Sequence, residues 1–375
     1  MPDFLPAPSA QTPKNNEILS RQIAFFAAFI LPVYKLLETP SILAEYAKGD
    51  LLLPAFLQFL AQVGVIFTLL TAASRSEKTL FERINETLGK WSIVFYLLYA
   101  AYFLFAAVLP LLDLEKFVYA AFYDTAPTIF SFAAFFFLAA YISAKGIKSV
   151  GRSADLSLFL FVLPFLALIA MSLIEADFQT LLPFFEQNFS ATLTAMTRTT
   201  PHFADAALLL PLIGNLRYQK GDRKKIIGGY ALGAGFTLLF LAVFYGIFST
   251  IALREHYAFV KIAQYFPVLA VVGRIDLLLI YMICIVLFLF TSFPLQFATD
   301  FTSRVFGERK KTWIAAFIAF AAFLFTLFCN KYYNAFYTVF GKYLAPVFII
   351  FCNVIPSLAL FLPKQNKKTK KKEHV

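Results

Sequence analysis

The chain has 375 residues, of which 60% are hydrophobic and 15% are charged, and its mean hydropathy is +0.73. Soluble globular domains carry about 25% charged residues, so this composition excludes an ordinary soluble protein and predicts one that crosses the membrane many times. The net charge of +11 is then explained by orientation in the bilayer and by attraction to anionic lipid, and it does not call for a nucleic-acid partner.

Ten stretches of the chain approach the roughly 20 apolar residues that a helix needs to cross a bilayer. Residues 1–21 are proline-rich and lack the layout of a cleavable signal, so we expect a cytoplasmic tail there. A basic tail, 363–375, is expected to follow the transmembrane domain, 22–362. We expect an all-α integral membrane protein whose ten transmembrane helices lie near 22–46, 51–73, 91–112, 127–144, 156–174, 198–216, 226–252, 275–298, 312–329 and 339–362.

The first of these spans is interrupted between Leu31 and Pro40. Lys35 and Glu38 each cost roughly 2.5–3.5 kcal/mol near a bilayer centre, so they are tolerable only if neutralised or wetted inside a bundle. The two side chains are three residues apart and are placed to pair with each other when no ligand is bound. The segment, with Pro32 and Tyr34, is therefore a candidate binding site. In the alternative interpretation the prolines only kink the helix and the two charges reach the outer surface.

The distribution of Lys and Arg over the connections gives a second prediction of the number of spans. Most Lys and Arg residues lie in the N-terminal tail and in alternate connections, namely 74–90, 145–155, 217–225, 299–311 and 363–375, and the other connections hold few. The positive-inside rule then predicts ten spans with both termini in the cytoplasm. Segment 74–90 carries apolar residues at helical spacing, so it is expected to form a helix on the cytoplasmic membrane surface or to dock a partner.

The sixth span is the weakest, because only Ala206 to Leu216 is strongly apolar, and it counts as a span only if Thr199 to Asp205 lies within the membrane. If so, it is a second broken helix, carrying Pro201, His202, Asp205, Pro211, Gly214 and Asn215. Otherwise Asp205 is an ordinary helix cap in an extracellular loop.

Two broken helices, five spans apart, predict an inverted five-plus-five repeat with a binding site between them. Backbone groups freed at such breaks can hold the carboxylate and ammonium of a small zwitterion. Tyr99 of the third span is a further candidate, although Tyr99 and Tyr102 fit interior packing as well. The predicted ligand-binding residues are Pro32, Tyr34, Lys35, Glu38, Tyr99, Asp205, Pro211, Gly214 and Asn215.

Motifs of catalysis are missing from the sequence. The three histidines are scattered, the three cysteines lack metal-ligand spacing, and there is no phosphate-binding glycine loop. Gly228, Gly229, Gly233 and Gly235 lie within an apolar span and fit close helix packing. We therefore expect neither an enzyme nor a cofactor nor a metal site.

Four short elements carry a resemblance to a known family. They are Ile18 to Gln22 before the first span, Thr125 to Pro127 before the fourth, Lys145 to Arg152 after it, and Gly273 to Asp276 before the eighth. In this order they resemble the endospore germination permease family, the B subunits of spore germinant receptors, within the amino acid–polyamine–organocation superfamily. Lys148 stands where that family commonly has glutamate, and the first span lacks the glycine expected at its break.

The resemblance implies a ten-helix fold with a small-molecule pocket between spans one, three, six and eight, and residence in a spore inner membrane. It also implies an A-type membrane subunit and a C-type lipoprotein subunit as partners. The predicted function is a permease-like receptor subunit that binds an amino-acid-like nutrient. The alternatives are a stand-alone proton-coupled amino-acid transporter and a purely structural scaffold.

Overall fold

The computed structural model describes residues 18–108, 110–114, 128–182, 185–265, 275–332 and 345–363. Within these ranges every regular element is a helix. The N-terminal tail up to residue 17, the elements at Thr125 to Pro127 and Gly273 to Arg274, and the basic tail after Pro363 lie outside the described residues.

The helices follow the predicted spans in order. The first half holds α1 (Ser20–Phe25), α2 (Leu31–Lys35), α3 (Thr39–Ala47), α4 (Leu52–Ser74), α5 (Leu80–Leu88), α6 (Ser92–Ala106), α8 (Thr128–Ala144) and α9 (Ile147–Glu175). The second half holds α10 (Phe189–Thr199), α11 (Asp205–Gly214), α12 (Asp222–Phe248), α13 (Ala258–Tyr265), α15 (Ile275–Phe306), α16 (Lys311–Lys331), α18 (Ala345–Ile349) and α19 (Ile355–Leu358).

Six helical stretches of the described chain are long and apolar enough to cross a membrane. They are Thr39–Ser74, Leu80–Leu114, Ile147–Glu175, Asp222–Arg254, Leu277–Phe306 and Glu308–Lys331. The helices at the other predicted spans are shorter or interrupted. An all-α integral membrane protein is thereby confirmed.

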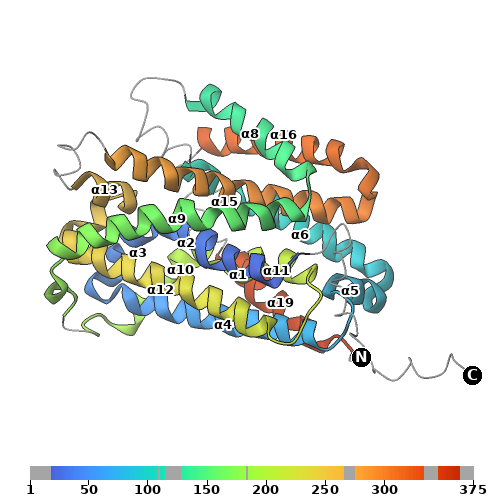
Figure 1. Ribbon diagram of the computed structural model, residues 1–375, viewed down its shortest axis with the longest axis horizontal. Coiled ribbons are helices and arrows are strands. Elements are labelled where there is room, and N and C mark those ends of the chain that lie inside the picture. The colour runs from blue at the N-terminus through green and yellow to red at the C-terminus, as the bar shows by residue number, and fades with distance from the viewer. Residues whose placement is uncertain are drawn as a thin grey trace, which may run out of the picture.

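Helices of the first half of the chain pack against helices of the second half. α4 packs against α12, α6 against α15, and α8 against α16. Figure 1 shows α8 and α16 side by side at the upper edge of the molecule, while α4 and α12 lie together near its lower edge. The two halves are therefore interleaved rather than separate.

The first span is broken twice. A π-helical turn, η1 (Phe26–Ile30), separates α1 from α2, and the turn of Leu36 to Glu38 separates α2 from α3. Pro32 and Pro40 lie at the starts of α2 and α3, where the missing amide hydrogen is tolerated.

Two glycines of α12 allow the first span to approach closely. A Cβ added at Gly229 would lie 2.5 Å from the carbonyl oxygen of Ala24, and one at Gly233 would lie 2.5 Å from that of Ala27. The predicted packing role is confirmed for these two residues. Gly228 and Gly235 face open space, so the prediction is wrong for them.

The sixth span begins earlier than predicted. Its first part is α10, and a short 3₁₀ turn, η5 (Thr200–Phe203), joins it to α11. The serine and threonine residues of α10 lower its hydropathy, which is why an apolar window missed it. Thr199, His202 and Asp205 are buried at this break. The interpretation of Asp205 as a cap in an exposed loop is therefore wrong.

Candidate functional site

The two helix breaks meet at one buried ion pair. Lys35 is the last residue of α2 and Asp205 is the first residue of α11. The Lys35 Nζ lies 2.7 Å from Asp205 Oδ1, and each side chain is 2% exposed. The same ammonium donates to the Leu31 carbonyl at 3.2 Å, and the Tyr230 hydroxyl donates to Asp205 Oδ2 at 2.7 Å. Both charges are thus compensated and hydrogen-bonded.

The helix ends and the surrounding rings suit these charges. A cation is stabilised at the carboxyl end of a helix and an anion at the amino end, which is where Lys35 and Asp205 lie. The ammonium also lies 5.4 Å from the ring centre of Phe203 and 5.8 Å from that of Phe59. The Lys35 ammonium and the Asp205 carboxylate therefore lie at the two helix ends where we expected the ammonium and carboxylate of a ligand.

Glu38 is not the partner of Lys35, so the predicted local pairing is wrong. Lys35 is 1% exposed, so the alternative in which it reaches the outer surface is also wrong. Glu38 is half-buried in the turn between α2 and α3. Burial, together with the nearby carboxylates of Glu38 and Asp113, raises the pKa of Tyr257 above its ordinary value. Glu38 thus lies near Tyr257 and Asp113, and Asp113 accepts a hydrogen bond from the Tyr34 hydroxyl.

Tyr34 lies between two other rings. Its ring stacks on His202 with the centroids 4.8 Å apart, and on Phe290 with the centroids 5.2 Å apart. The Tyr34 hydroxyl donates to Asp113 Oδ2 at 2.6 Å, and His202 Nδ1 lies 2.9 Å from the Thr39 hydroxyl. The stack joins both helix breaks to α15.

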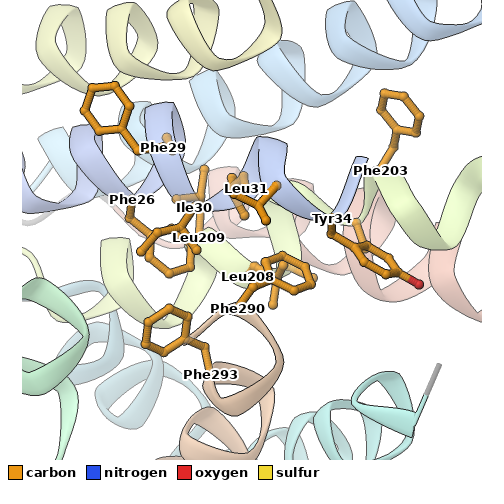
Figure 2. Close-up of a cluster of buried hydrophobic side chains, with 14 of the residues drawn as sticks. Phe26, Phe29, Ile30, Leu31, Tyr34, Phe203, Leu208, Leu209, Phe290 and Phe293 are labelled. Atoms are coloured by element: carbon orange, nitrogen blue, oxygen red, sulfur yellow. The ribbon is translucent and has the colours of Figure 1, made fainter. Parts of the chain in front are cut away.

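A cavity of about 20 Å³ lies beside this stack. That is room for about one water molecule. Figure 2 shows Tyr34, Leu208 and Phe290, which line it, lying close together. The wall is almost entirely apolar and comes from spans one, three, six, eight and ten: Tyr34, Tyr102, Phe103, Ala106, Pro110, Pro201, Ala204, Leu208, Phe290, Pro294 and Phe348.

Several predicted site residues lie elsewhere. Tyr99 donates to the Phe351 carbonyl at 3.1 Å and stacks on Phe301, which is interior packing. Gly214 and Asn215 lie at the far end of α11, about 14 Å from Asp205 at 1.5 Å per residue. The Asn215 amide nitrogen donates to the Pro211 carbonyl at 2.8 Å.

Asn215 belongs to a second polar group, which we call the Asp300 cluster: Asn215, Asp300, Arg304 and Lys311. Arg304 Nη2 donates to Asn215 Oδ1 at 2.7 Å and lies 3.2 Å from Asp300 Oδ2. Lys311 Nζ lies 3.1 Å from Asp300 Oδ1. This cluster joins the ends of α11 and α15 to the start of α16.

Three residues that complete the site were not predicted from the sequence: Tyr230, Asp113 and Gln62. Gln62 Oε1 accepts from the Ala206 amide at 2.9 Å, and Gln62 Nε2 donates to Asn353 Oδ1 at 2.8 Å. A glutamine within the apolar second span was an available signal. Tyr230 gave no signal in the sequence, because aromatic residues are common in these spans. Asp113 gave none because it falls at the end of a span.

The interrupted helices, the buried charge pair between them and the apolar bundle around them define a permease-like membrane protein. A solved structure, MhsT in complex with L-phenylalanine, is similar to this chain with a TM-score of 0.60 and 15% identity, over 92% of this chain and 89% of that one. At this identity the likeness shows a shared fold.

The family is shown by a second comparison. A sequence model of the family described as Spore germination protein matches residues 21–335, and the chain belongs to that family. No curated protein matches the chain.

Proposed function

We propose that this chain is a permease-like germinant receptor subunit, which binds a small amino-acid-like ligand between its two helix breaks and signals to partner subunits. One observation carries the proposal: the breaks meet at a buried ammonium–carboxylate pair beside a cavity walled by five spans. Membership of the spore germination family supports the biological role. The shared fold with MhsT, whose structure holds L-phenylalanine, supports an amino acid as ligand.

The architecture proposed for this function has ten transmembrane helices in an inverted five-plus-five repeat, with both termini in the cytoplasm. The packing of α4 on α12, α6 on α15 and α8 on α16 supports the repeat, because equivalent helices of two interleaved halves meet near the axis that relates them. The basic connections support the orientation.

The chemistry of the cavity favours a ligand with an apolar side chain. Aromatic rings and prolines form its wall, so a polar side chain would lose its hydrogen bonds to water on entering. A volume of about 20 Å³ is too small for an amino acid, so binding requires the ring stack at Tyr34 to open. The ligand's ammonium and carboxylate would then replace or extend the Lys35–Asp205 pair. Pro32, Tyr34, Lys35, Glu38 and Asp205 are the residues we propose for the site.

Membership of the spore germination family supports a proposal about partners and location. We propose an A-type membrane subunit and a C-type lipoprotein subunit as partners, in the spore inner membrane. Tyr99 is not proposed as a direct contact, because it donates to the Phe351 carbonyl and stacks on Phe301. Pro211, Gly214 and Asn215 are not proposed either, because they lie in or just after the second half of α11, away from Asp205.

The test is germination of spores that carry Lys35→Ala or Glu38→Ala. We expect each to require a higher amino-acid concentration than wild type, and Lys35→Ala more so. The exposed Lys220→Ala on the connection before α12 is the matched control, and immunoblots establish equal protein levels. An unchanged dose response for both site variants would overturn the pocket assignment.

A second function, a stand-alone proton-coupled transporter, is favoured by the same buried pair, because an ionisable pair between broken helices can exchange a proton. Proteoliposomes that contain only this chain separate the two functions. Accumulation of labelled amino acid under a pH gradient would favour the transporter. Thermal-shift screening against amino acids, sugars and nucleosides tests the third possibility, since a scaffold would respond to none.

A further inference from the structure

A second and larger cavity lies between the surface helix α5 and the last span. Its volume is about 210 Å³. Its walls come from α5, α6, α11 and the end of the chain: Leu80, Ile84, Leu88, Phe95, Tyr99, Leu210, Ile355, Pro356, Leu358, Ala359 and Leu362. The lining is apolar except for the Tyr99 hydroxyl, which already donates to the Phe351 carbonyl.

The cavity is built by the apolar stripe of α5. Leu80, Ile84 and Leu88 are spaced by four residues and thus share one helix face, while the other residues of that helix are polar except for the buried Phe81. The helix is fixed at its start by a capping box in which Thr79 accepts from the Glu82 amide at 3.3 Å and Glu82 accepts from the Thr79 amide at 2.9 Å. Leu80 and Ile84 are 0% and 6% exposed and line the cavity with Leu88, so the stripe faces the cavity.

The cavity has an open and a closed end. At the mouth, Leu88 is 40% exposed and Leu358 is 53% exposed. At the inner end, Tyr99 is 0% exposed and Leu210 is 2% exposed. The cavity thus opens to the outside of the protein between the ends of α5 and α19, and it ends against α11.

The walls decide what can fill this space. Water needs two to four polar partners, which the lining does not offer, and an apolar cavity of about 150 Å³ in another protein stays dry and takes up hydrocarbon. The mouth of this cavity has exposed leucines and lies beside α5, the helix that the sequence predicts at the membrane surface, so lipid acyl chains are the apolar molecules within reach of it. We propose that the cavity holds one acyl chain of an anionic phospholipid.

The charge at the rim supports an anionic headgroup. Arg75 Nη1 donates to the Leu360 carbonyl at 2.5 Å, and Arg83 Nη2 donates to the Leu362 and Pro363 carbonyls at 3.3 and 3.0 Å. Both guanidinium groups therefore lie beside the segment that forms the outer wall. The bond to Leu360 uses one of the five donors of Arg75, which is half-buried, so the others can reach a phosphate. Arg83 is buried and holds the wall in place.

The test uses the full-length protein in vesicles with a phosphatidylglycerol that carries a diazirine on one acyl chain. After irradiation, we expect adducts concentrated on residues 80–88 and 355–362. Ala359→Trp fills the cavity from its wall and should reduce these adducts severalfold. Ala101→Trp on the exposed face of α6 is the matched control and should leave them unchanged.

A headgroup measurement keeps the proposal testable if Ala359→Trp fails to fold. Wild type should be labelled severalfold more by phosphatidylglycerol than by the equivalent phosphatidylcholine. Arg75→Gln should lose that preference, and the exposed Arg152→Gln should keep it. Adducts spread evenly over all lipid-facing helices would overturn the proposal, as would a peptide or a second copy of the chain crosslinked in the cavity.

Discussion

Two charged groups in this protein are built in opposite ways. The Lys35–Asp205 pair joins one cation to one anion, with each side chain 2% exposed. In the Asp300 cluster one carboxylate serves two cations, and the side chains of Asp300, Arg304 and Lys311 are 9%, 20% and 16% exposed. If either Lys35 or Asp205 loses its charge, no other charged side chain that the structure describes replaces it. The Asp300 cluster has a second cation and is accessible to water.

The difference distinguishes a candidate binding site, the Lys35–Asp205 pair, from a structural charge network, the Asp300 cluster. A fully desolvated pair depends on both members, so any event that changes one charge is felt at both helix breaks at once. The Asp300 cluster spreads its charge over α11, α15 and α16, and Arg304 also lies 4.4 Å from the Phe81 ring centre. Such a network holds helix ends together and tolerates the loss of a member. This contrast supports our proposal that the ligand binds at the Lys35–Asp205 pair.

The largest effect is expected from Asp205→Asn. The amide would leave the Lys35 ammonium buried without a counter-charge, so the free energy of unfolding should fall by about 3–5 kcal/mol. Thermal unfolding of the detergent-solubilised protein measures the loss. The double variant Lys35→Met with Asp205→Leu removes both charges and should recover most of it. A double variant as unstable as the single one would show that the charges do not compensate each other.

The second prediction concerns the helix that supplies Tyr230 to Asp205. Gly229→Ala would press a methyl group against the Ala24 backbone, so it should move α12 from α1 and cost about 1–3 kcal/mol. The adjacent Gly228 faces open space and is the matched control. Gly228→Ala should be neutral or stabilise the helix by up to about 1 kcal/mol, because alanine favours helices. Equal melting temperatures for the two variants would contradict a close approach at the site.

Both members of the ion pair could be found from the sequence, but not the fact that they pair. Lys35 and Asp205 stand out because each is a charge within or beside an apolar run, which is a local signal. Their contact joins residues 170 positions apart, and it depends on how two interrupted helices pack. Local spacing instead favoured Glu38 as the partner of Lys35, but in the buried site Lys35 pairs with Asp205.

The spans were predictable for the same reason, since hydropathy is local and nearly every expected stretch is helical. The start of the sixth span was not, because α10 is rich in hydroxyl side chains, which bond to carbonyls within their own helix, as Thr199 does to Ala195. The ring stack at Tyr34 and the role of Tyr230 were also hidden. In a chain with 48 Phe and 18 Tyr residues, an aromatic position carries no signal by itself.

A smaller effect is expected in the Asp300 cluster. Asp300→Asn would remove the carboxylate that Arg304 and Lys311 share, but both cations are partly wet and Arg304 keeps Asn215. The loss should therefore be about 1–2 kcal/mol, between the values for exposed and buried pairs. Lys311→Met should cost less, because Arg304 still neutralises Asp300. If Asp300→Asn lowered the free energy of unfolding as much as Asp205→Asn, the distinction between a candidate binding site and a structural charge network would be wrong.

The smallest effect is expected at the exposed end of the first span, where Arg21 Nη2 lies 3.3 Å from Asp155 Oδ1 and the side chains are 63% and 32% exposed. Water and salt screen this pair, so Arg21→Gln should change the free energy of unfolding by no more than about 0.5 kcal/mol. Gln22 Nε2 still donates to Asp155 Oδ2 at 3.2 Å and keeps α1 on α9. Melting curves at low and high salt measure the change. Because exposure sets the order of the three effects on charged groups, a loss at Arg21 larger than that at Asp300 would mean that burial does not govern the charged groups of this protein.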